Sequence, residues 1–288
     1  MIDDTRRGMV LAATFSLLII GMDALVKHAA ALYPVAMVVW ARYTFHLAST
    51  PLFGMRGGLG ALVRTRQLGL QILRSVCMLG ATAFFFSSLA LIPLADAIAI
   101  GFVGPFIVVA LARPILGERA GADIWIACAV GFVGALIIIR PGFADRHWAY
   151  LLPLGASLSG SLYGILTRRL GSAERPTTSL FYMALVGAVA SSLVVPFFWQ
   201  SPDALGWLTL GAIGLSAAGA HLILIQAYRL APASVIAPLH YLDIVWGSVL
   251  GLVVFDDFPD TLTWVGIAVI VASGLYVFQR QAAGRRQG

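Results

Sequence analysis

Ionisable side chains inside otherwise apolar stretches are the residues of this sequence best placed to do chemistry. A charge at the centre of a membrane-length apolar helix costs about 2.5–3.5 kcal/mol on insertion scales, so each such group is expected to face protein or water. The set comprises Asp23, Lys27, Arg42, His46, His221, His240 and Asp243. These residues are the first candidates for a binding site.

His240 and Asp243 have the most informative spacing in this set. Three residues apart in one apolar run, they share a helix face. The imidazole and the carboxylate could exchange a proton, or the acid could receive the ammonium group of an amino acid. The alternative is a buried pair that only fixes helix packing. We expect these two side chains to line a cavity, and His221 is a further candidate that could equally belong to the core.

Asp23 and Lys27 are four residues apart, the spacing at which an acid preceding a base forms an ion pair on one helix face. This charged pair could act at a gate, or it could end a helix with Lys27 extending to the membrane surface. Arg42 lies deep in the next apolar run, where its side chain either pairs with Asp23 or binds a carboxylate. The sequence leaves these alternatives open.

Aromatic side chains are expected to form the rest of the pocket. Offset stacking of two rings contributes about 0.5–1.5 kcal/mol beyond burial, so an aromatic lining suits an aromatic or large apolar solute. The aromatic residues expected in the substrate site are Phe84, Phe102, Tyr163, Tyr241 and Trp246. Tryptophans near the ends of the apolar runs are expected to anchor helices at the membrane surface.

Ten apolar stretches, each about as long as a bilayer is thick, must position these residues. Hydrophobic residues make up 60% of the 288 and charged residues 11%, whereas a soluble domain has about a quarter charged residues. The stretches lack the alternating pattern of a membrane barrel. The prediction is an all-α polytopic membrane protein with helices at Gly8–Val26, Pro34–Phe53, Ile72–Leu91, Ala95–Leu116, Ile124–Ile139, Ala149–Leu166, Ser179–Trp199, Leu205–Tyr228, Ser234–Phe255 and Leu262–Phe278.

Basic residues predict the orientation, because they concentrate in the cytoplasmic loops of membrane proteins. With the amino terminus inside, fifteen of the nineteen lysines and arginines fall on the cytoplasmic side: Arg6, Arg7, Arg56, Arg64, Arg66, Arg74, Arg113, Arg119, Arg168, Arg169, Arg175, Arg229, Arg280, Arg285 and Arg286. Only Lys27, Arg140 and Arg146 lie outside. Both termini are therefore expected to be cytoplasmic, in the inner membrane of a bacterial-type cell.

An internal repeat with a shift of 139 residues organises the chain. It pairs Gly80 with Gly219, Pro93 with Pro232 and Trp125 with Trp264, and needs no gap between Gly80 and Leu136. An odd number of spans per half makes the second half an inverted copy of the first, the arrangement that carriers use for alternating access. The sequence thus predicts two five-helix repeats, residues 1–146 and 147–288; a duplication that only enlarged the bundle is the alternative.

Small residues and prolines indicate where helices could pack closely or bend. Gly160 and Gly164 in one run, and Gly247 and Gly251 in another, have the spacing that lets helix backbones approach. Pro105 and Pro238 interrupt the fourth and ninth stretches, where each proline removes a backbone donor. Both prolines are expected to serve as hinges.

Related motifs recur in the two halves and resemble those of a known family. The first half contains Leu91-Ile92-Pro93-Leu94-Ala95-Asp96-Ala97, Gly104-Pro105 and Leu116-Gly117-Glu118-Arg119; the second contains Leu230-Ala231-Pro232-Ala233-Ser234, Leu242-Asp243 and Phe255-Asp256-Asp257. With ten spans and short loops, this pattern resembles the drug/metabolite transporter superfamily, EamA type, and within it the aromatic amino acid exporters of the YddG kind. The family commonly has Glu-Pro where the second half has Leu242-Asp243.

The expected function is a secondary transporter, most simply an exporter of amino acids with aromatic or apolar side chains. Uptake or exchange of a nucleoside-like or vitamin-like metabolite on the same scaffold is the alternative. An enzyme is not expected, because Ser157 lacks the fuller motif of a serine protease, although His221 or His240 could be cast as its base. Neither a cofactor nor a metal site nor nucleic-acid binding is indicated. The expected partners are a small-molecule substrate and the lipid bilayer, with a monomer as the simplest assembly.

Overall fold

The computed structural model describes residues 2–54, 59–116, 121–140, 148–170, 174–231 and 233–284, and every regular element in these ranges is helical. The expectation of an all-α protein is confirmed for this part of the chain. The α-helices are α1 (Ile2–Leu32), α2 (Val35–Gly54), α3 (Leu59–Val63), α4 (Leu68–Leu89), α5 (Leu94–Gly101), α6 (Gly104–Leu116), α7 (Ala122–Ile139), α8 (Leu152–Leu170), α9 (Pro176–Val194), α10 (Ala204–Leu230), α11 (Ala233–Ile236), α12 (Leu242–Phe255) and α13 (Thr261–Gly284). Short 3₁₀ segments are η2 (Trp148–Leu151), η4 (Val195–Phe198) and η5 (Ala237–Tyr241).

Several predicted features fall outside these described ranges. They are the motif residues Gly117, Glu118 and Pro232, the basic residues Arg56, Arg119, Arg146, Arg285 and Arg286, and the predicted boundary between residues 146 and 147.

Nine helical segments of the described chain are long and apolar enough to cross a membrane, and they correspond to nine of the ten expected stretches. The remaining stretch is α2, which has 20 residues but is not among the nine. Its sequence includes Arg42 and His46, which lower its apolar character, and both side chains are only 3% exposed. Length and composition therefore identify nine spans rather than ten.

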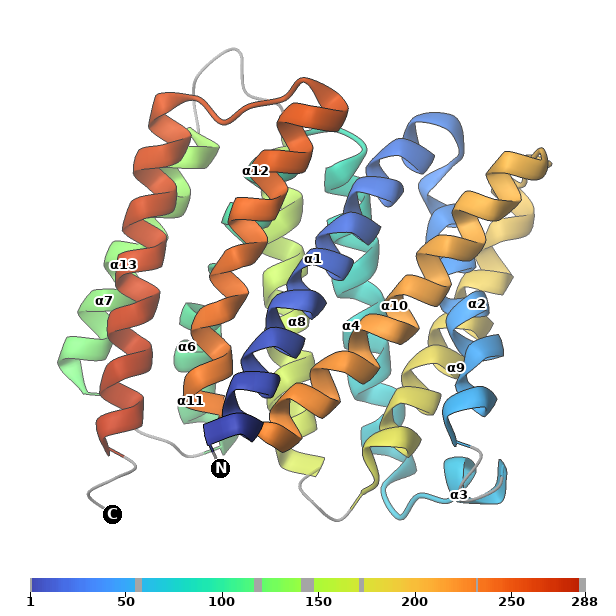
Figure 1. Ribbon diagram of the computed structural model, residues 1–288, viewed down its shortest axis with the longest axis horizontal. Helices are drawn as coiled ribbons and strands as arrows, with labels where there is room; N and C mark the ends of the chain where they lie inside the picture. Colours follow the sequence, from blue (N-terminus) through green and yellow to red (C-terminus); the bar gives the residue numbers. More distant parts are fainter. Residues whose placement is uncertain are drawn as a thin grey trace.

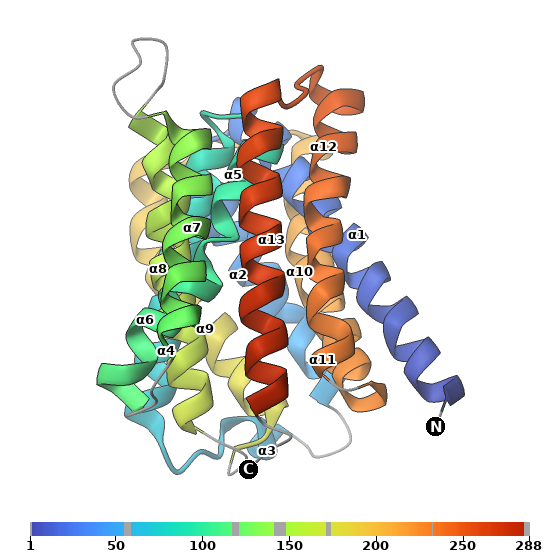
Figure 2. The same ribbon diagram turned by 90° about the vertical axis from the view of Figure 1, so that its left-hand side faces the viewer.

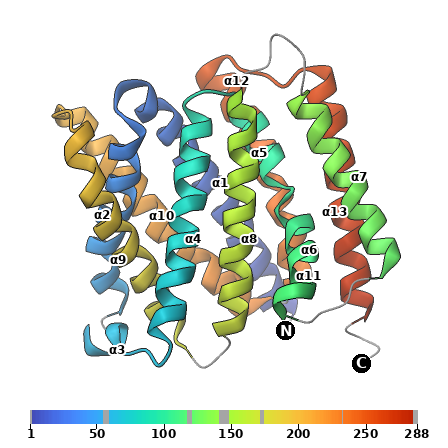
Figure 3. The same cartoon turned by 180° about the vertical axis from the view of Figure 1, so that it is seen from behind.

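The helices form two layers closed by a helix pair at each edge (Figures 1 to 3). One layer contains α1, α10 and α12, and the other contains α4, α8 and the pair α5 and α6. At one edge α2 packs against α9, and at the other α7 packs against α13. Both layers contribute side chains to the space between them.

The distribution of side chains is the reverse of that in a soluble protein. Large apolar side chains face outward, with Leu193 72%, Val253 74% and Phe197 83% exposed, while Gln71 and Arg74 are buried within α4. Apolar side chains on the outer face of a helix bundle match a hydrocarbon surrounding. The chain is therefore a multi-pass membrane protein.

The two sides of the bundle can be named from the ends of the chain's helices. The start of α1 and the end of α13 lie on one side, here called the terminal side, and the connection from α12 to α13 lies on the opposite side (Figure 1). Two aspartates begin helices on that opposite side. Asp203 accepts a hydrogen bond from the Gly206 amide (2.7 Å) at α10, and Asp260 accepts one from the Thr263 amide (2.8 Å) at α13.

Candidate functional site

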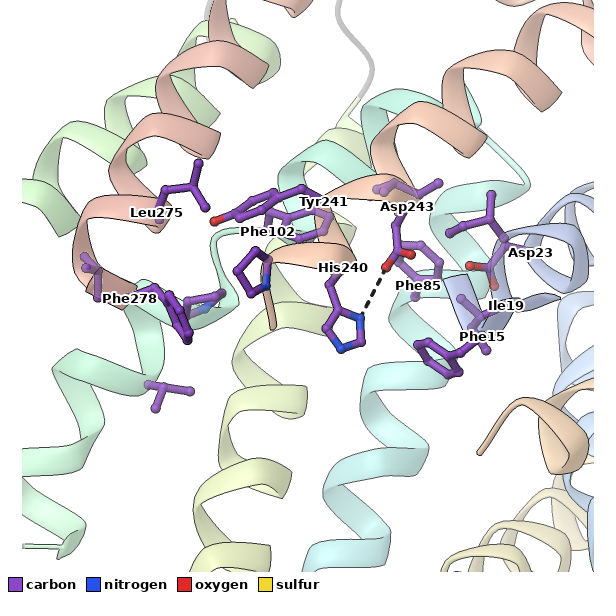
Figure 4. A pocket seen from close by; sticks show the side chains of 18 of the residues that line it. Phe15, Ile19, Asp23, Phe85, Phe102, His240, Tyr241, Asp243, Leu275 and Phe278 are labelled. Carbon is purple, nitrogen blue, oxygen red and sulfur yellow. Dashed lines mark ion pairs between the residues drawn. The ribbon is translucent and has the colours of Figure 1, made fainter. Parts of the chain in front are cut away.

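A cavity of about 830 Å³ lies between the two layers (Figure 4). A second pocket of about 580 Å³ adjoins it, because Phe15, Asp23, Phe85 and Pro105 line both. We call them the larger and the smaller lobe of the central cavity. Pockets that bind small molecules commonly have volumes of roughly 300–1,000 Å³, so each lobe could hold part or all of a metabolite.

Interruptions in the fourth and ninth stretches place residues on the larger lobe. Helix α5 ends at Gly101 and α6 begins at Gly104, so Pro105 lies in the first turn of a new helix, where its missing amide is tolerated. In the second half, Pro238 lies in the 3₁₀ segment η5, which leads directly into α12. Both predicted hinge prolines therefore lie at breaks, and both line the larger lobe.

Asp243 is the best-connected acid of the cavity. Its carboxylate accepts a hydrogen bond from the Ser16 hydroxyl of α1 and lies 3.9 Å from His240 Nδ1. The His240 ring packs edge-on against Phe15 at 5.5 Å, and its Nε2 lies 3.5 Å from the Tyr228 hydroxyl. The predicted pair thus lines the larger lobe, and Ser16 completes a polar group that joins α1 to α12.

A stacked pair of rings forms another wall of the larger lobe. The rings of Phe102 and Tyr241 are 5.0 Å apart with an interplanar angle of 21°. Figure 4 shows this pair beside Leu275 on one side of the lobe, with Asp243 and Asp23 on the other. An aromatic surface facing acids can bind a planar ring that carries a positive or hydrogen-bond-donating group.

Three predicted site residues lie outside the lining of both lobes. The Phe84 side chain is 43% exposed and packs over Gly155 of α8. The Tyr163 hydroxyl accepts a hydrogen bond from Arg74 at 2.7 Å. Trp246 is partly buried in the core, and its indole nitrogen has no hydrogen-bond partner in the described structure.

The smaller lobe contains the other predicted basic and imidazole groups. Arg42 and His221 both line it. The His221 Nδ1 lies 2.7 Å from the carbonyl oxygen of Ala217 and therefore carries the proton. The His221 ring is 5.9 Å from that of His46, whose Nδ1 has no partner in the described structure.

The expected ion pair of Asp23 with Lys27 is wrong for this structure, and so is a direct pair of Asp23 with Arg42. The Lys27 ammonium instead donates to the Ile92 carbonyl at 2.8 Å and lies 3.6 Å from the Asp257 carboxylate. Phe255 packs beneath the same ammonium at 5.3 Å. The lysine reaches toward the end of its helix, where carbonyl and carboxylate oxygens are available, so Asp23 is left to line both lobes.

A second ion pair joins loops on the same opposite side of the bundle. The Arg140 guanidinium donates to the Asp260 carboxylate, which also receives the Thr263 amide. The hydrogen bond from Arg140, followed by that from the Thr263 amide, holds the pKa of Asp260 below its usual range, and Asp260 in turn raises the pKa of Arg140. The pair of Lys27 with Asp257 and the pair of Arg140 with Asp260 thus both lie at the opposite side of the bundle.

The predicted packing glycines divide into two groups. A Cβ on Gly247 would lie 2.5 Å from the Ile98 Cδ1 atom of α5, and one on Gly251 would lie 2.8 Å from the Asp257 carbonyl oxygen. Gly160 has only Ala81 near, at 3.9 Å, and Gly164 has open space beside it. Gly247 therefore lies where α12 packs closely on α5, whereas Gly251 makes room for the loop that follows its own helix.

Arg74, which was counted among the basic residues of the cytoplasmic side, is buried inside the bundle. Its side chain is 1% exposed within α4. The guanidinium donates to Gln71 (2.9 Å), Thr167 (3.1 Å) and the Ser179 carbonyl (3.2 Å), in addition to Tyr163. Neutral acceptors from α4, α8 and α9 thus hold it. The spacing of Gln71 and Arg74, one helical turn apart, was the only available signal.

The serine required for a protease has no general base beside it. The Ser157 hydroxyl donates to the carbonyl oxygens of Gly101 (3.0 Å) and Pro153 (2.8 Å). Both contacts are ordinary helix-packing hydrogen bonds. A multi-pass helical bundle with a central cavity and isolated charged groups has the construction of a membrane transporter rather than of this enzyme.

Comparison with known proteins agrees with this class. Residues 147–279 match the model of the EamA-like transporter family. A riboflavin transporter of Rhizobium johnstonii is 30% identical over 281 residues, which cover 97% of this chain and 92% of that protein. An S-adenosylmethionine uptake transporter of Rickettsia prowazekii is 25% identical over 83% of this chain and 81% of its own length. A protein of known crystal structure aligns over 98% of this chain and 99% of its own, with a TM-score of 0.66 and 20% identity, which shows the fold alone.

The chain belongs to the EamA family of the drug/metabolite transporter superfamily. It is a transporter of small metabolites and not an enzyme. The names of these relatives refer to riboflavin and S-adenosylmethionine, so they do not support the expected likeness to amino acid exporters.

Proposed function

We propose that this protein moves a small metabolite containing a planar ring across the bacterial inner membrane by alternating access, with the central cavity as its binding site. The observation that carries the proposal is the stacked pair of Phe102 and Tyr241 on a lobe that also contains Asp243. Stacking gives affinity for a ring, and the acid gives orientation through a hydrogen bond or charge.

Ten crossings are the first part of this proposal. Helix α1 ends on the opposite side, whereas α3 lies on the terminal side (Figure 1), so α2 connects the two sides. Counting α2 with the nine apolar segments gives an even number of crossings, in agreement with α1 beginning and α13 ending on one side. With the basic residues as a guide, both termini are proposed to be cytoplasmic.

Two inverted halves, residues 1–146 and 147–288, are the second part. The repeat relates α1 to α8, α4 to α10, α5 and α6 to η5 and α12, and α7 to α13. The helix contacts agree with this correspondence. Helix α4 packs on α8 as its counterpart α10 packs on α1, and α6 packs on α8 as its counterpart α12 packs on α1. In the pairs α2 with α9 and α7 with α13, each helix packs on its own counterpart. Such symmetry supports two interconvertible states, open on either side.

An amino acid with an aromatic or apolar side chain, exported from the cell, is the first cargo proposed. Its ring would stack in the larger lobe, and its ammonium group would lie at Asp243 or Asp23, which both line that lobe. Removing the acid would leave the ammonium without a charged partner in a low-dielectric site.

A vitamin-like cargo taken up by the cell is the second candidate. It is favoured by the 30% identity with a riboflavin transporter over almost the whole chain. Riboflavin has a broad planar ring that could use the same stacked pair. Its hydroxyl-bearing side chain would then lie among the polar groups of the cavity.

Transport in proteoliposomes tests the proposal directly. Vesicles containing the purified protein are loaded with labelled tryptophan or riboflavin, and efflux is compared with protein-free vesicles, with and without a pH gradient. We expect saturable flux of at least one of the two, lowered in Tyr241→Ala and Asp243→Asn. A correctly inserted protein that moves neither solute, or whose flux is indifferent to both substitutions, contradicts the proposed site.

A further inference from the structure

The Arg42 guanidinium is a buried cation that lines the smaller lobe, and two of its three nitrogens have no hydrogen-bond partner in the described structure. Its side chain is 3% exposed and lines the lobe. Its Nε and Nη1 atoms make no hydrogen bond within the described structure. A guanidinium presents five N–H donors in one plane, so an unoccupied edge is an unused site for an anion.

Two aromatic rings lie beside the Arg42 guanidinium. The guanidinium carbon lies 4.7 Å from the centre of the Tyr43 ring and 5.8 Å from that of Phe86. The attraction between a cation and the face of an aromatic ring stabilises the buried guanidinium. The Nε and Nη1 donors make no hydrogen bond in the described structure, so Arg42 keeps unused donors beside the lobe that it lines.

Protein carboxylates do not neutralise Arg42 through a direct contact in the described residues. Asp23 lines the same lobe, but the ion pairs found among the described residues involve Lys27, Arg140, His240 and Arg280, and none of them includes Arg42 or Asp23. Asp243 is engaged by Ser16. A buried charge without a hydrogen-bonded partner carries a penalty of several kcal/mol, which binding of an anion would offset.

The hydroxyl groups that line the smaller lobe already donate hydrogen bonds to backbone oxygens and do not compete with Arg42 as donors to an anion. Ser157 donates to the Gly101 carbonyl, Ser161 donates to the Gly104 carbonyl at 2.9 Å, and Thr82 lies 3.0 Å from the Met78 carbonyl. The proton of each hydroxyl is directed to a backbone oxygen. Arg42 is therefore the charged donor of this lobe.

We infer that the smaller lobe is an oxyanion subsite, in which Arg42 binds a carboxylate or phosphate group of the cargo while the ring of the same molecule lies in the larger lobe. Asp23 borders both lobes and so faces the middle of such a molecule, where an amino acid has its ammonium group. The inference rests on the proposed function and narrows it to solutes that combine a planar ring with an oxyanion.

Matched ligands separate the oxyanion from the ring. Binding to the purified protein is measured for tryptophan against tryptamine, which lacks the carboxylate, and for flavin mononucleotide against riboflavin, which lacks the phosphate. In the wild-type protein at least one member that carries an oxyanion is expected to bind about tenfold to a hundredfold more tightly than its counterpart without the oxyanion, because hydrogen bonds to charged groups contribute roughly 1.5–3 kcal/mol. Arg42→Gln is expected to abolish that preference, and Arg42→Lys to keep part of it.

Arg74→Gln is the matched control, because it removes an equally buried guanidinium that already has neutral partners and does not line either lobe. It is expected to leave the ligand preference unchanged even where it lowers stability. Elution on size exclusion and the thermal midpoint identify variants that fail to fold.

Thermal midpoints measured with benzoate and with inorganic phosphate test the oxyanion subsite without the transported solute. Either anion is expected to raise the thermal midpoint of the wild-type protein and not that of Arg42→Gln. Stabilisation by inorganic phosphate that depends on Arg42, without binding of tryptophan, tryptamine, riboflavin or flavin mononucleotide, supports the subsite and contradicts the proposed function. Binding of riboflavin or tryptamine as tight as that of its anionic counterpart, together with no stabilisation by benzoate or phosphate, overturns the subsite and leaves the function standing.

Discussion

The rings of Phe102 and Tyr241 stack at 5.0 Å, and the two residues are 139 positions apart, which is the shift of the proposed internal repeat. The proposed repeat therefore makes them equivalent residues of its two halves. In that proposed symmetry, two equivalent residues that touch lie close to the axis relating the halves. The wall of the cavity formed by this pair is therefore the place where exchange of the two halves would move side chains least.

The stacked pair should contribute to ring binding as a unit. We expect Phe102→Ala and Tyr241→Ala each to weaken binding of the transported ring by about twofold to tenfold, the range that stacking energies of roughly 0.5–1.5 kcal/mol imply. The double variant should lose less than the sum of the two free-energy changes, because each ring orients the other. Titration of the purified protein with the best cargo from the liposome assay measures these effects. Phe84→Ala is the control, since Phe84 packs on Gly155; full additivity would argue against a joint role.

The helical content and nine of the spans could be predicted because apolar length alone determines them. Which face of each helix meets the cavity could not. In the run Phe84-Phe85-Phe86, successive rings point about 100° apart around the helix. Phe84 is 43% and Phe86 2% exposed, and Phe85 lines both lobes. The sequence contains the three rings, but only the positions of the neighbouring helices decide that Phe84 is exposed, that Phe85 lines both lobes and that the buried Phe86 lines the smaller lobe alone.

The polar residues of the site show the same limit. His240 and Asp243 share a helix face whatever surrounds them, so their proximity could be predicted from spacing. Ser16 is 227 positions from Asp243, and Asp257 is equally remote from Lys27, so these contacts depend on tertiary packing. Spacing within a helix wrongly favoured Asp23 as the partner of Lys27, because acceptors contributed by other segments were invisible in the sequence.

Lys27 should act as a latch on the opposite side of the bundle. Lys27→Met keeps the length of the side chain but removes the contacts to the Ile92 carbonyl and Asp257. We expect the cavity to become more accessible from that side. The gain would reach about tenfold if most of the free energy of one charged hydrogen bond contributes to the equilibrium between the closed and open states. A cysteine replacing Ile20, which lines the larger lobe, reports this through its rate of labelling by a membrane-impermeant maleimide, with Cys77 and Cys128 replaced.

Two further variants separate the contacts of this latch. In Lys27→Arg the cysteine at position 20 should be labelled slowly, because the arginine keeps the positive charge of the latch. Asp257→Asn should have a smaller effect than Lys27→Met, since the Asp257 side chain is 38% exposed and its attraction is weakened by solvent. Equal labelling in the wild-type protein and in Lys27→Met would contradict the latch.

Arg74 should stabilise the packing of α4 against α8 and α9. In Arg74→Lys the ammonium cannot reach Gln71, Thr167 and Tyr163 together, so buried acceptors lose their donor. Each unsatisfied buried group costs about 1–3 kcal/mol, and we expect a clear fall in the thermal midpoint in detergent. Tyr163→Phe should show a smaller fall, because it removes one acceptor only. Arg64→Lys, at an exposed position, is the control; a midpoint in Arg74→Lys equal to that control would show that the network adds no stability.

Asp260 should make the stability of the protein depend on pH in the acid range. Its pKa is lowered in the folded protein by Arg140 and then by the Thr263 amide, so its contribution is complete above its unfolded pKa of about 3.9 and is lost as the pH falls toward the folded value. Asp260→Asn keeps the helix cap but removes the charge. We expect the wild-type protein to have the higher thermal midpoint between about pH 5 and 8, with the difference narrowing below about pH 4.

Salt and a neighbouring carboxylate test whether the Arg140 contact causes this difference. The Asp260 side chain is 50% exposed, so the wild-type advantage should shrink in about 1 M NaCl, where the screening length falls to about 3 Å. Asp256→Asn removes a carboxylate from the same loop that has no ion pair among the described residues, and asparagine tolerates its positive φ of 55°. This control should match the wild-type curve from pH 3 to 8. A difference in Asp260→Asn that stays constant down to pH 3 would mean that the cap or local packing, and not the ion pair with Arg140, stabilises the start of α13.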